Sequence, residues 1–159
     1  MITKDKIETI LETVCDPEVP VLSIMDLGIV RNIQIEEDKV QIDITPTYSG
    51  CPAMQTITMG IRMAMLEHGI SNFIIKEVLS PAWTTDWMSE SGKQKLEAYG
   101  IAPPQYSVKN NVHEKDAVIP CPQCKSTNTQ VVSQFGSTSC KALYKCNNCL
   151  EPFDYFKCH

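Results

Sequence analysis

Two pairs of cysteines near the end of the chain constrain its fold more than any other feature of the sequence. Cys121 and Cys124 form one C-x2-C pair, and Cys146 and Cys149 form a second pair after 21 intervening residues. The turn within such a pair directs both sulfurs to one point, and two pairs complete a tetrahedral site of four sulfurs. The spacing therefore predicts a bound metal with four cysteine ligands.

The size of this region makes the metal necessary for folding. About 40 residues bury too little apolar surface to offset the entropy of the chain, whereas a structural zinc contributes on the order of 10–16 kcal/mol. Residues 129–135, 141–145 and 153–157 are rich in strand-forming side chains, so we expect an all-β zinc ribbon over residues 119–159. Iron in a rubredoxin-type site has the same geometry. We favour zinc because Lys125 and Leu150 stand where those iron sites usually have glycine.

Two further cysteines of the ribbon, Cys140 and Cys158, are not needed for this site. If the second cysteine pair joins two antiparallel strands, residues whose numbers add up to about 297 face each other, and these two cysteines become neighbours. They could form a second metal or redox site with His159. The interpretation that we favour is that both are small buried thiols that pack the ribbon.

The preceding hundred residues predict an α+β fold with the order α-β-β-α-β-α. Periodic apolar residues predict helices over 3–15, capped by Thr3 and ended by Asp16-Pro17, and over 52–68, ended by Gly69. Residues 29–35 and 40–46 predict a β-hairpin, residues 72–79 a third strand, and residues 89–100 a short helix. We expect a domain over 1–102, a proline-containing linker over 103–118, and the ribbon over 119–159.

Composition excludes several classes of function. A net charge of −5 and a sequence pI near 5.2 argue against nucleic-acid binding, which depends on neutralising phosphates. There is no apolar run of about 20 residues to cross a membrane, and the charged first ten residues do not resemble a secretory signal. We therefore expect a cytoplasmic protein, in which eight cysteines indicate metal binding or thiol chemistry rather than disulfides.

Cys51 lies alone in the segment TYSGCPAMQ, directly before a predicted helix. With Pro52 as the first helical residue, Cys51 would be the N-cap, where unpaired N–H groups and the helix dipole favour a thiolate. The alternative is a cysteine that fills a small hole under the loop. Catalysis by a cysteine–histidine pair is disfavoured, because His68 is about 25 Å away along the same helix.

As a metal ligand, Cys51 would be one soft donor with hard oxygen donors available from Asp16, Glu18 and Asp26. A permanently bound iron–sulfur cluster normally takes four cysteines. One thiolate would hold a cluster only transiently, or would share it across a homodimer. The sequence thus favours a carrier that is not itself catalytic.

Two tryptophans, Trp83 and Trp87, lie four residues apart in the segment AWTTDW. Exposed tryptophans are common anchors of protein interfaces. At this spacing the two could equally be core residues, and the sequence leaves both interpretations open.

Several segments resemble known families. DPEVPVLSIMDLGIVRNI (16–33) and TPTYSGCPAM (45–54) resemble the signature segments of the MIP-18 family (domain of unknown function 59), whose members act in iron–sulfur protein maturation. The resemblance implies that Cys51 is the functional cysteine, and that Asp16, Glu18 and Asp26 form the acidic motif. SPAWTTDWMSESGKQKLEAYGIAPP (80–104), followed by the cysteine-rich ribbon, resembles the PaaD (PaaJ) type proteins of phenylacetate degradation.

The second resemblance implies an accessory role beside ring-1,2-phenylacetyl-CoA epoxidase, a multicomponent oxygenase. Its expected partners are the di-iron oxygenase subunit and the iron–sulfur and flavin reductase, into which it would help to insert a cluster or iron. The alternative is a docking protein that binds these components through the ribbon and the tryptophan loop. An enzyme in its own right is the third and least favoured hypothesis.

Overall fold

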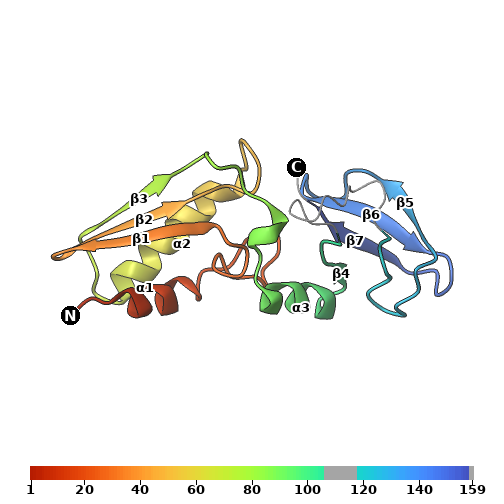
Figure 1. Ribbon diagram of the computed structural model, residues 1–159, viewed down its shortest axis with the longest axis horizontal. Helices are drawn as coiled ribbons and strands as arrows, with labels where there is room; N and C mark the ends of the chain where they lie inside the picture. The colour runs from red at the N-terminus through yellow and green to blue at the C-terminus, as the bar shows by residue number, and fades with distance from the viewer. Residues whose placement is uncertain (106–117, 158–159) are drawn as a thin grey trace. The chain divides into compact units, whose positions relative to one another are not determined.

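The computed structural model describes residues 1–105 and 118–157 (Figure 1). The chain divides into two compact units, Met1–Trp83 and Thr84–His159, which are described separately below. Most of the predicted linker lies outside the described residues. The domain boundaries at 102 and 119 therefore stay a prediction.

The first unit begins with helix α1 (Lys4–Leu11), whose N-cap is Thr3, as predicted: its Oγ1 accepts a hydrogen bond from the N–H of Lys6 at 3.3 Å. The prediction that this helix continues to residue 15 is wrong. After Leu11 the chain makes only single turns, and the carbonyl of Val14 then accepts a hydrogen bond from the N–H of Ile24 in the following loop at 2.9 Å. This non-local pairing ends the helix early, although the apolar periodicity continues.

The sheet of the first unit has the order β1-β2-β3, formed by β1 (Val30–Glu36), β2 (Lys39–Ile44) and β3 (Phe73–Glu77). The predicted hairpin is confirmed, since β1 and β2 pair in antiparallel fashion, and β3 joins β2 in parallel. Val40, Ile42 and Ile44 are buried on one face, as their alternation predicts. On the other face, the Gln41 amide donates to the Asp43 carboxylate at 2.9 Å.

Helix α2 (Ala53–Glu67) makes the crossover between the parallel strands β2 and β3. Its inner face buries Met54, Ile57, Ile61 and Met65. Gly69 follows the C-cap His68 with a φ of +74°, which confirms the predicted end of the helix. Helices α1 and α2 contact each other and together close the core of this unit (Figure 1).

Trp83 belongs to the core of the first unit rather than to a free surface. Its side chain is 4% exposed, and its indole N–H donates to the carbonyl of Leu27 at 2.7 Å. This contact spans 56 positions in the sequence. Of the two interpretations of Trp83, the structure therefore supports the core residue, while Trp87 is half-buried.

The second unit starts with a 3-10 turn, η1 (Thr85–Trp87), and helix α3 (Glu90–Ala98), which the Ser89 hydroxyl caps and Gly100 ends as predicted. Its sheet has the order β4-β7-β6-β5, formed by the short β4 (Ile101–Ala102), β5 (Thr129–Ser133), β6 (Lys141–Cys146) and β7 (Pro152–Phe156). The three predicted ribbon strands are confirmed. Strand β4, which pairs in parallel with β7, is an addition to the prediction.

The ribbon has a small core that lies beside the four cysteines. Tyr144 of β6 stacks on Phe153 of β7, with 5.8 Å between ring centroids, and meets Tyr155 edge-on at 5.6 Å. The buried members of this core are Ala102, Ile119, Cys121, Ala142, Cys146, Phe153 and Tyr155. In addition, Lys125 forms an ion pair with Glu97 of α3.

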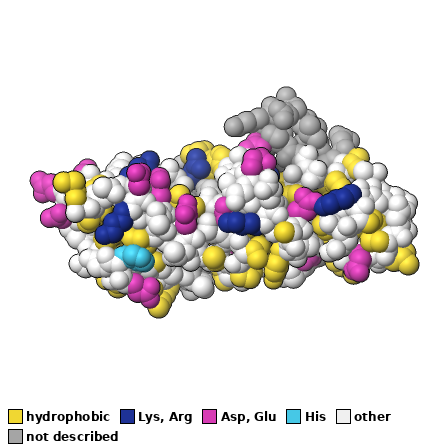
Figure 2. All heavy atoms as spheres, turned by 90° about the horizontal axis from the view of Figure 1, so that it is seen from below, with side chains coloured by type: hydrophobic (Ala, Val, Ile, Leu, Met, Phe, Trp, Pro, Cys, Tyr) yellow, Lys and Arg dark blue, Asp and Glu magenta, His cyan; other side chains and the backbone are white. Residues whose placement is uncertain are grey.

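Two further observations concern the helices and one face of the molecule. Of the helices that the structure describes, none has the length and hydropathy required to span a bilayer. On the face drawn in Figure 2, basic side chains are scattered singly among acidic and hydrophobic ones. This face therefore lacks the continuous basic surface that is typical of nucleic-acid-binding proteins.

Candidate functional site

The structure brings the four predicted metal ligands together at one end of the ribbon. The sulfur atoms of Cys121, Cys124, Cys146 and Cys149 all lie within 4.8 Å of one another. Sγ–Sγ distances are 3.7 Å for Cys121–Cys149 and 3.5 Å for Cys124–Cys146. A tetrahedral zinc with Zn–S bonds of about 2.3 Å requires sulfurs about 3.8 Å apart. The four-cysteine site thus fits a structural zinc.

The backbone around each cysteine pair has the same local fold. The N–H of Cys121 donates to the carbonyl of Ser126, and that of Cys146 donates to the carbonyl of Glu151, each at 2.9 Å. The residues that follow the second cysteines, Lys125 and Leu150, have φ angles of 64° and 67°. Both residues therefore adopt the left-handed conformation, which glycine adopts without strain but which is strained for residues with larger side chains.

Hydrogen bonds from the backbone prepare one cysteine of this site for metal binding. The N–H of Cys149 donates to Cys146 Sγ at 3.5 Å; this bond, together with one from the Asn148 N–H and hydrogen bonds with neighbouring thiols, lowers the pKa of the Cys146 thiol to about 6. The N–H of Glu151 acts in the same direction on Cys149, but desolvation and hydrogen bonds with the neighbouring thiols raise its pKa to about 12. Without metal, these thiols cannot all ionise together, so metal binding must displace protons.

Of the three residues predicted to form a second ribbon site, Cys140, Cys158 and His159, the structure describes only Cys140. The predicted register is confirmed, since β6 and β7 pair with residue numbers that add up to 297, as in Lys141 with Phe156. Cys140 is buried, and its thiol lies 3.1 Å from the Thr138 hydroxyl. Cys158 and His159 lie outside the described residues, so a second metal or redox site stays a prediction.

Cys51 lies in the turn that leads into α2, but not at the position that the sequence predicts. The helix begins at Ala53 with Pro52 as its N-cap, so the prediction that Cys51 is the N-cap is wrong by one residue. The N–H of Cys51 donates to the carbonyl of Tyr48 at 3.3 Å, which closes a tight turn. Gly50 within this turn has a φ of +74°, a conformation that favours glycine.

The environment of Cys51 disfavours the thiolate, contrary to the prediction. Burial raises the pKa of the Cys51 thiol, while hydrogen bonds from the Ala53 N–H and the Tyr48 side chain lower it by less. The negative charges of Glu18 and Asp16 raise the pKa further. The thiol is therefore protonated at neutral pH. The sequence could not reveal this, because both carboxylates come from a loop more than 30 positions away.

The structure places the predicted oxygen donors in different roles. Asp16 and Glu18 lie close enough to Cys51 for their charges to act on it. Asp16 is buried, and its Oδ1 also accepts hydrogen bonds from the N–H groups of Glu18 and Val19 at 2.7 and 3.0 Å. Asp26 Oδ2 accepts a hydrogen bond from the backbone N–H of Ser23 at 3.3 Å.

These residues do not form a ready-made metal site like that of the ribbon. Within residues 1–105 and 118–157, the ribbon cysteines are the only group of three or more ligands that is gathered closely enough to hold an ion. Cys51, Asp16, Glu18 and Asp26 therefore stay predicted cluster-binding residues. His68 is the C-cap of α2, so it lies at the opposite end of this helix from Cys51.

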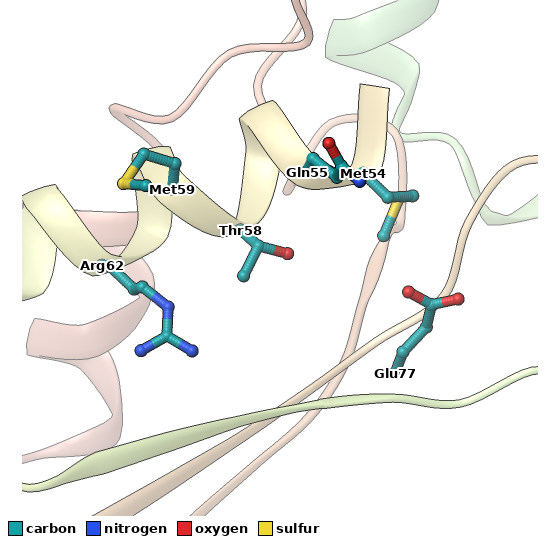
Figure 3. A pocket seen from close by; sticks show the side chains of 6 residues that line it. All are labelled: Met54, Gln55, Thr58, Met59, Arg62 and Glu77. Carbon is teal, nitrogen blue, oxygen red and sulfur yellow. The ribbon is translucent and has the colours of Figure 1, made fainter. Parts of the chain in front are cut away.

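A groove between α2 and β3 was not predicted from the sequence. It has a volume of about 270 Å³ and is lined by Met54, Gln55, Thr58, Met59, Arg62 and Glu77. Figure 3 shows the side chains of Met54, Thr58 and Arg62 pointing from α2 toward the strand that carries Glu77. Helical periodicity groups the five α2 residues, but Glu77 joins them only through the parallel pairing of β3 with β2.

Comparisons with protein families assign one family model to each part of the chain. Residues 4–68 match the model of the iron–sulfur cluster assembly proteins. Residues 105–157 match the PaaD zinc β-ribbon domain. The first match includes Cys51, Asp16, Glu18 and Asp26, and the second includes all four ribbon cysteines.

Individual relatives match either nearly the whole chain or about three fifths of it. A protein of Escherichia coli (strain K12), described as a putative D subunit of 1,2-phenylacetyl-CoA epoxidase, is 46% identical over 96% of this chain and 92% of its own length. An Fe-S protein maturation auxiliary factor of Porphyromonas gingivalis is 34% identical over 59% of this chain and 90% of its own. The crystal structure of a DUF59 domain from Bacillus anthracis matches 58% of this chain and 90% of its own, with 27% identity and a TM-score of 0.56.

Proposed function

This chain belongs to the family of the 1,2-phenylacetyl-CoA epoxidase D subunits, and on that premise we propose that it is a maturation factor for the epoxidase. In this role it delivers an iron–sulfur cluster or iron, its cargo, to the oxygenase and reductase subunits in the cytoplasm. It does not itself catalyse the oxygenation. The cargo is held at Cys51.

The observation that carries the proposal is the position of Cys51 within the iron–sulfur assembly region, residues 4–68. The thiol is half-buried at the start of α2, with Asp16 and Glu18 nearby. A relative that is 34% identical over 59% of this chain is described as an Fe-S protein maturation auxiliary factor. These facts support a role in handling iron rather than in binding the organic substrate.

The raised pKa of Cys51 gives the cargo a reversible attachment. The neutral thiol loses its proton to water when iron binds, so binding carries the cost of deprotonation. A bound cation also relieves the repulsion between the new thiolate and the two carboxylates, which therefore favour occupancy over an empty thiolate. One sulfur ligand with this cost holds the cargo weakly, and a client with several cysteines can remove it.

The ribbon has a different role in the proposal. Its four cysteines are used for the structural zinc, and its edge strand β5 exposes Val131 and Val132. Phe135, two residues after the end of this strand, is also exposed. Exposed apolar residues on an edge strand favour contact with another protein.

The same exposed strand supports a second candidate function, a docking protein that binds the epoxidase components without carrying metal. The burial of Trp83 weakens one part of this alternative, since of the two tryptophans in the loop only Trp87 has an accessible side chain. The two candidates differ in what they require of Cys51. The maturation factor needs its sulfur, and the docking protein has no need of it.

Replacing Cys51 by serine in a strain that makes the full epoxidase separates the two candidates. We expect Cys51→Ser to fold normally and to leave the reductase short of iron and acid-labile sulfide. Cys15→Ser is the matched control, because Cys15 is an exposed cysteine of the same unit. A fully metallated reductase in the Cys51→Ser strain would contradict the maturation role and favour the docking protein.

A further inference from the structure

We propose that the groove between α2 and β3 is where a client protein docks: an extended segment of the reductase adds to the free edge of β3 and places an acidic side chain on Arg62 and a basic one on Glu77. This inference rests on the proposed function, because it concerns how the client is brought to Cys51. It concerns the first unit alone.

The free edge of β3 supplies the backbone groups for this contact. In the sheet order β1-β2-β3, strand β3 is terminal within the described residues. The carbonyl of Asn72 and the N–H of Val78 bond to β2, at 3.0 and 2.8 Å. Because the backbone groups of successive residues point to opposite sides of a strand, those of Phe73, Ile75 and Glu77 face away from β2. A partner strand can pair with all three residues.

The groove supplies charges that select the segment. Arg62 is the only basic residue within α2, and Glu77 is the last residue of β3. Neither side chain forms an ion pair with any residue that the structure describes, although both line the groove and are exposed. A single neutral side chain could not satisfy both charges, whereas a segment with one acid and one base could.

Apolar contacts extend the same surface along α2. Met59 and Leu66 are each 57% exposed and lie on the same side of the helix as Arg62. Methionine side chains adapt to different partners, which makes them common in binding surfaces. Every second side chain of an added strand would face these exposed apolar residues of α2.

The groove also begins beside the cargo site. Met54, which lines it, donates its backbone N–H to the carbonyl of Cys51 at 3.3 Å. In Figure 3 the carboxylate of Glu77 lies at the same end of the groove as Met54, and Arg62 lies toward the other end. A segment bound along β3 would therefore end near the turn that contains Cys51.

The test is the affinity of the full chain for purified, cluster-free reductase, measured by calorimetry. We expect Arg62→Glu and Glu77→Lys each to weaken binding at least about tenfold, because each places a like charge against the segment. Lys39→Glu and Glu36→Lys are the controls, since they make the same charge changes at the β1–β2 turn of the same unit. Equal affinities for all four variants, or no binding by the wild-type chain, would overturn the proposal.

Amide hydrogen exchange distinguishes strand addition from other contacts at the groove. Binding of reductase should slow exchange at Phe73, Ile75 and Glu77 at least about tenfold and leave β1, at the opposite edge, unchanged. Absence of this protection in the complex would also overturn the proposal. Cys51→Ser should bind reductase as tightly as wild type. If it does, yet reductase is fully metallated in its presence, the maturation role fails while docking stands.

Discussion

The two units use the same element, sulfur, in opposite ways. In the ribbon, four cysteines converge within 4.8 Å and form a complete shell for one ion. In the first unit, Cys51 has no second cysteine beside it in such a group among the described residues, and burial keeps its thiol protonated. The comparison teaches that the number of gathered ligands, rather than the presence of cysteine, decides whether a ready-made metal site is present.

The units also differ in what holds them together and in charge. Residues 1–83 contain six basic and twelve acidic residues, and the remainder contains eight and seven. The first unit has a broad aliphatic core, whereas the ribbon core has seven buried residues, two of which are metal ligands. We therefore expect the first unit to be stable without metal and the ribbon to depend on it.

Removing zinc is the strongest test of this difference. Chelation, or Cys146→Ser, should unfold the ribbon and leave the first unit folded, because metal binding contributes on the order of 10 kcal/mol to small zinc domains. Two-dimensional NMR of the full chain would show the loss of dispersed amide signals for residues 119–157 and for β4, which pairs with β7, while residues 1–83 keep theirs. Cys15→Ser should retain every signal. A metal-free chain with a folded ribbon would remove the basis of the comparison.

A cavity in the core of the first unit should destabilise that unit and leave the zinc site of the ribbon unchanged. Ile61 is fully buried on α2, and Ile61→Ala should lower the free energy of unfolding of this unit by about 2–5 kcal/mol. The zinc content should not change. Met63→Ala, on the exposed side of the same helix, is the control and should change stability by no more than about 0.5 kcal/mol. Loss of zinc from Ile61→Ala would show that the two units are not independent.

The reactivity of Cys51 sharpens the contrast between the two kinds of cysteine. Because its pKa is raised, only a small fraction is thiolate at pH 7, and alkylation should accelerate about tenfold per pH unit from pH 7 to 9. The four zinc-bound cysteines should stay protected. Iodoacetamide labelling of the zinc-loaded chain, read by peptide mass spectrometry, measures both. A labelling rate for Cys51 that levels off below pH 8 would contradict the assignment.

The smallest effect is expected at the turn after the second cysteine pair. Leu150 has a φ of 67° and an exposed side chain, so Leu150→Gly should stabilise the ribbon by about 1 kcal/mol through relief of backbone strain. Denaturant unfolding of the zinc-loaded chain measures the change. Lys145→Gly within β6 is the control and should destabilise the ribbon by roughly 0.5–1 kcal/mol. Equal destabilisation by both substitutions would show that the turn is not strained.

Local patterns in the sequence predicted most of the fold. The alternation of Val40, Ile42 and Ile44 identified the buried face of β2, and Gly69 and Gly100 marked two helix ends. The spacing of the ribbon cysteines predicted both the metal site and the register of β6 with β7. These features depend on residues that are close in sequence or linked by one turn.

The failures came from contacts between distant segments. Helix α1 ends early because Val14 pairs with Ile24, and the pKa of Cys51 depends on burial and on Asp16 and Glu18. The groove containing Arg62 required the position of a strand whose parallel pairing no local pattern reveals. Sequence analysis thus identified which residues matter, but not the environment that sets their chemistry.

The two-residue strand β4 has a practical consequence. It lies before the predicted linker, yet Ile101 and Ala102 pair with Asp154 and Tyr155 of the last strand. A graft of the metal-binding module onto another protein would have to begin upstream of Ile101, so that β4 is kept. A graft that started at the first cysteine would leave one flank of β7 bare and prone to self-association.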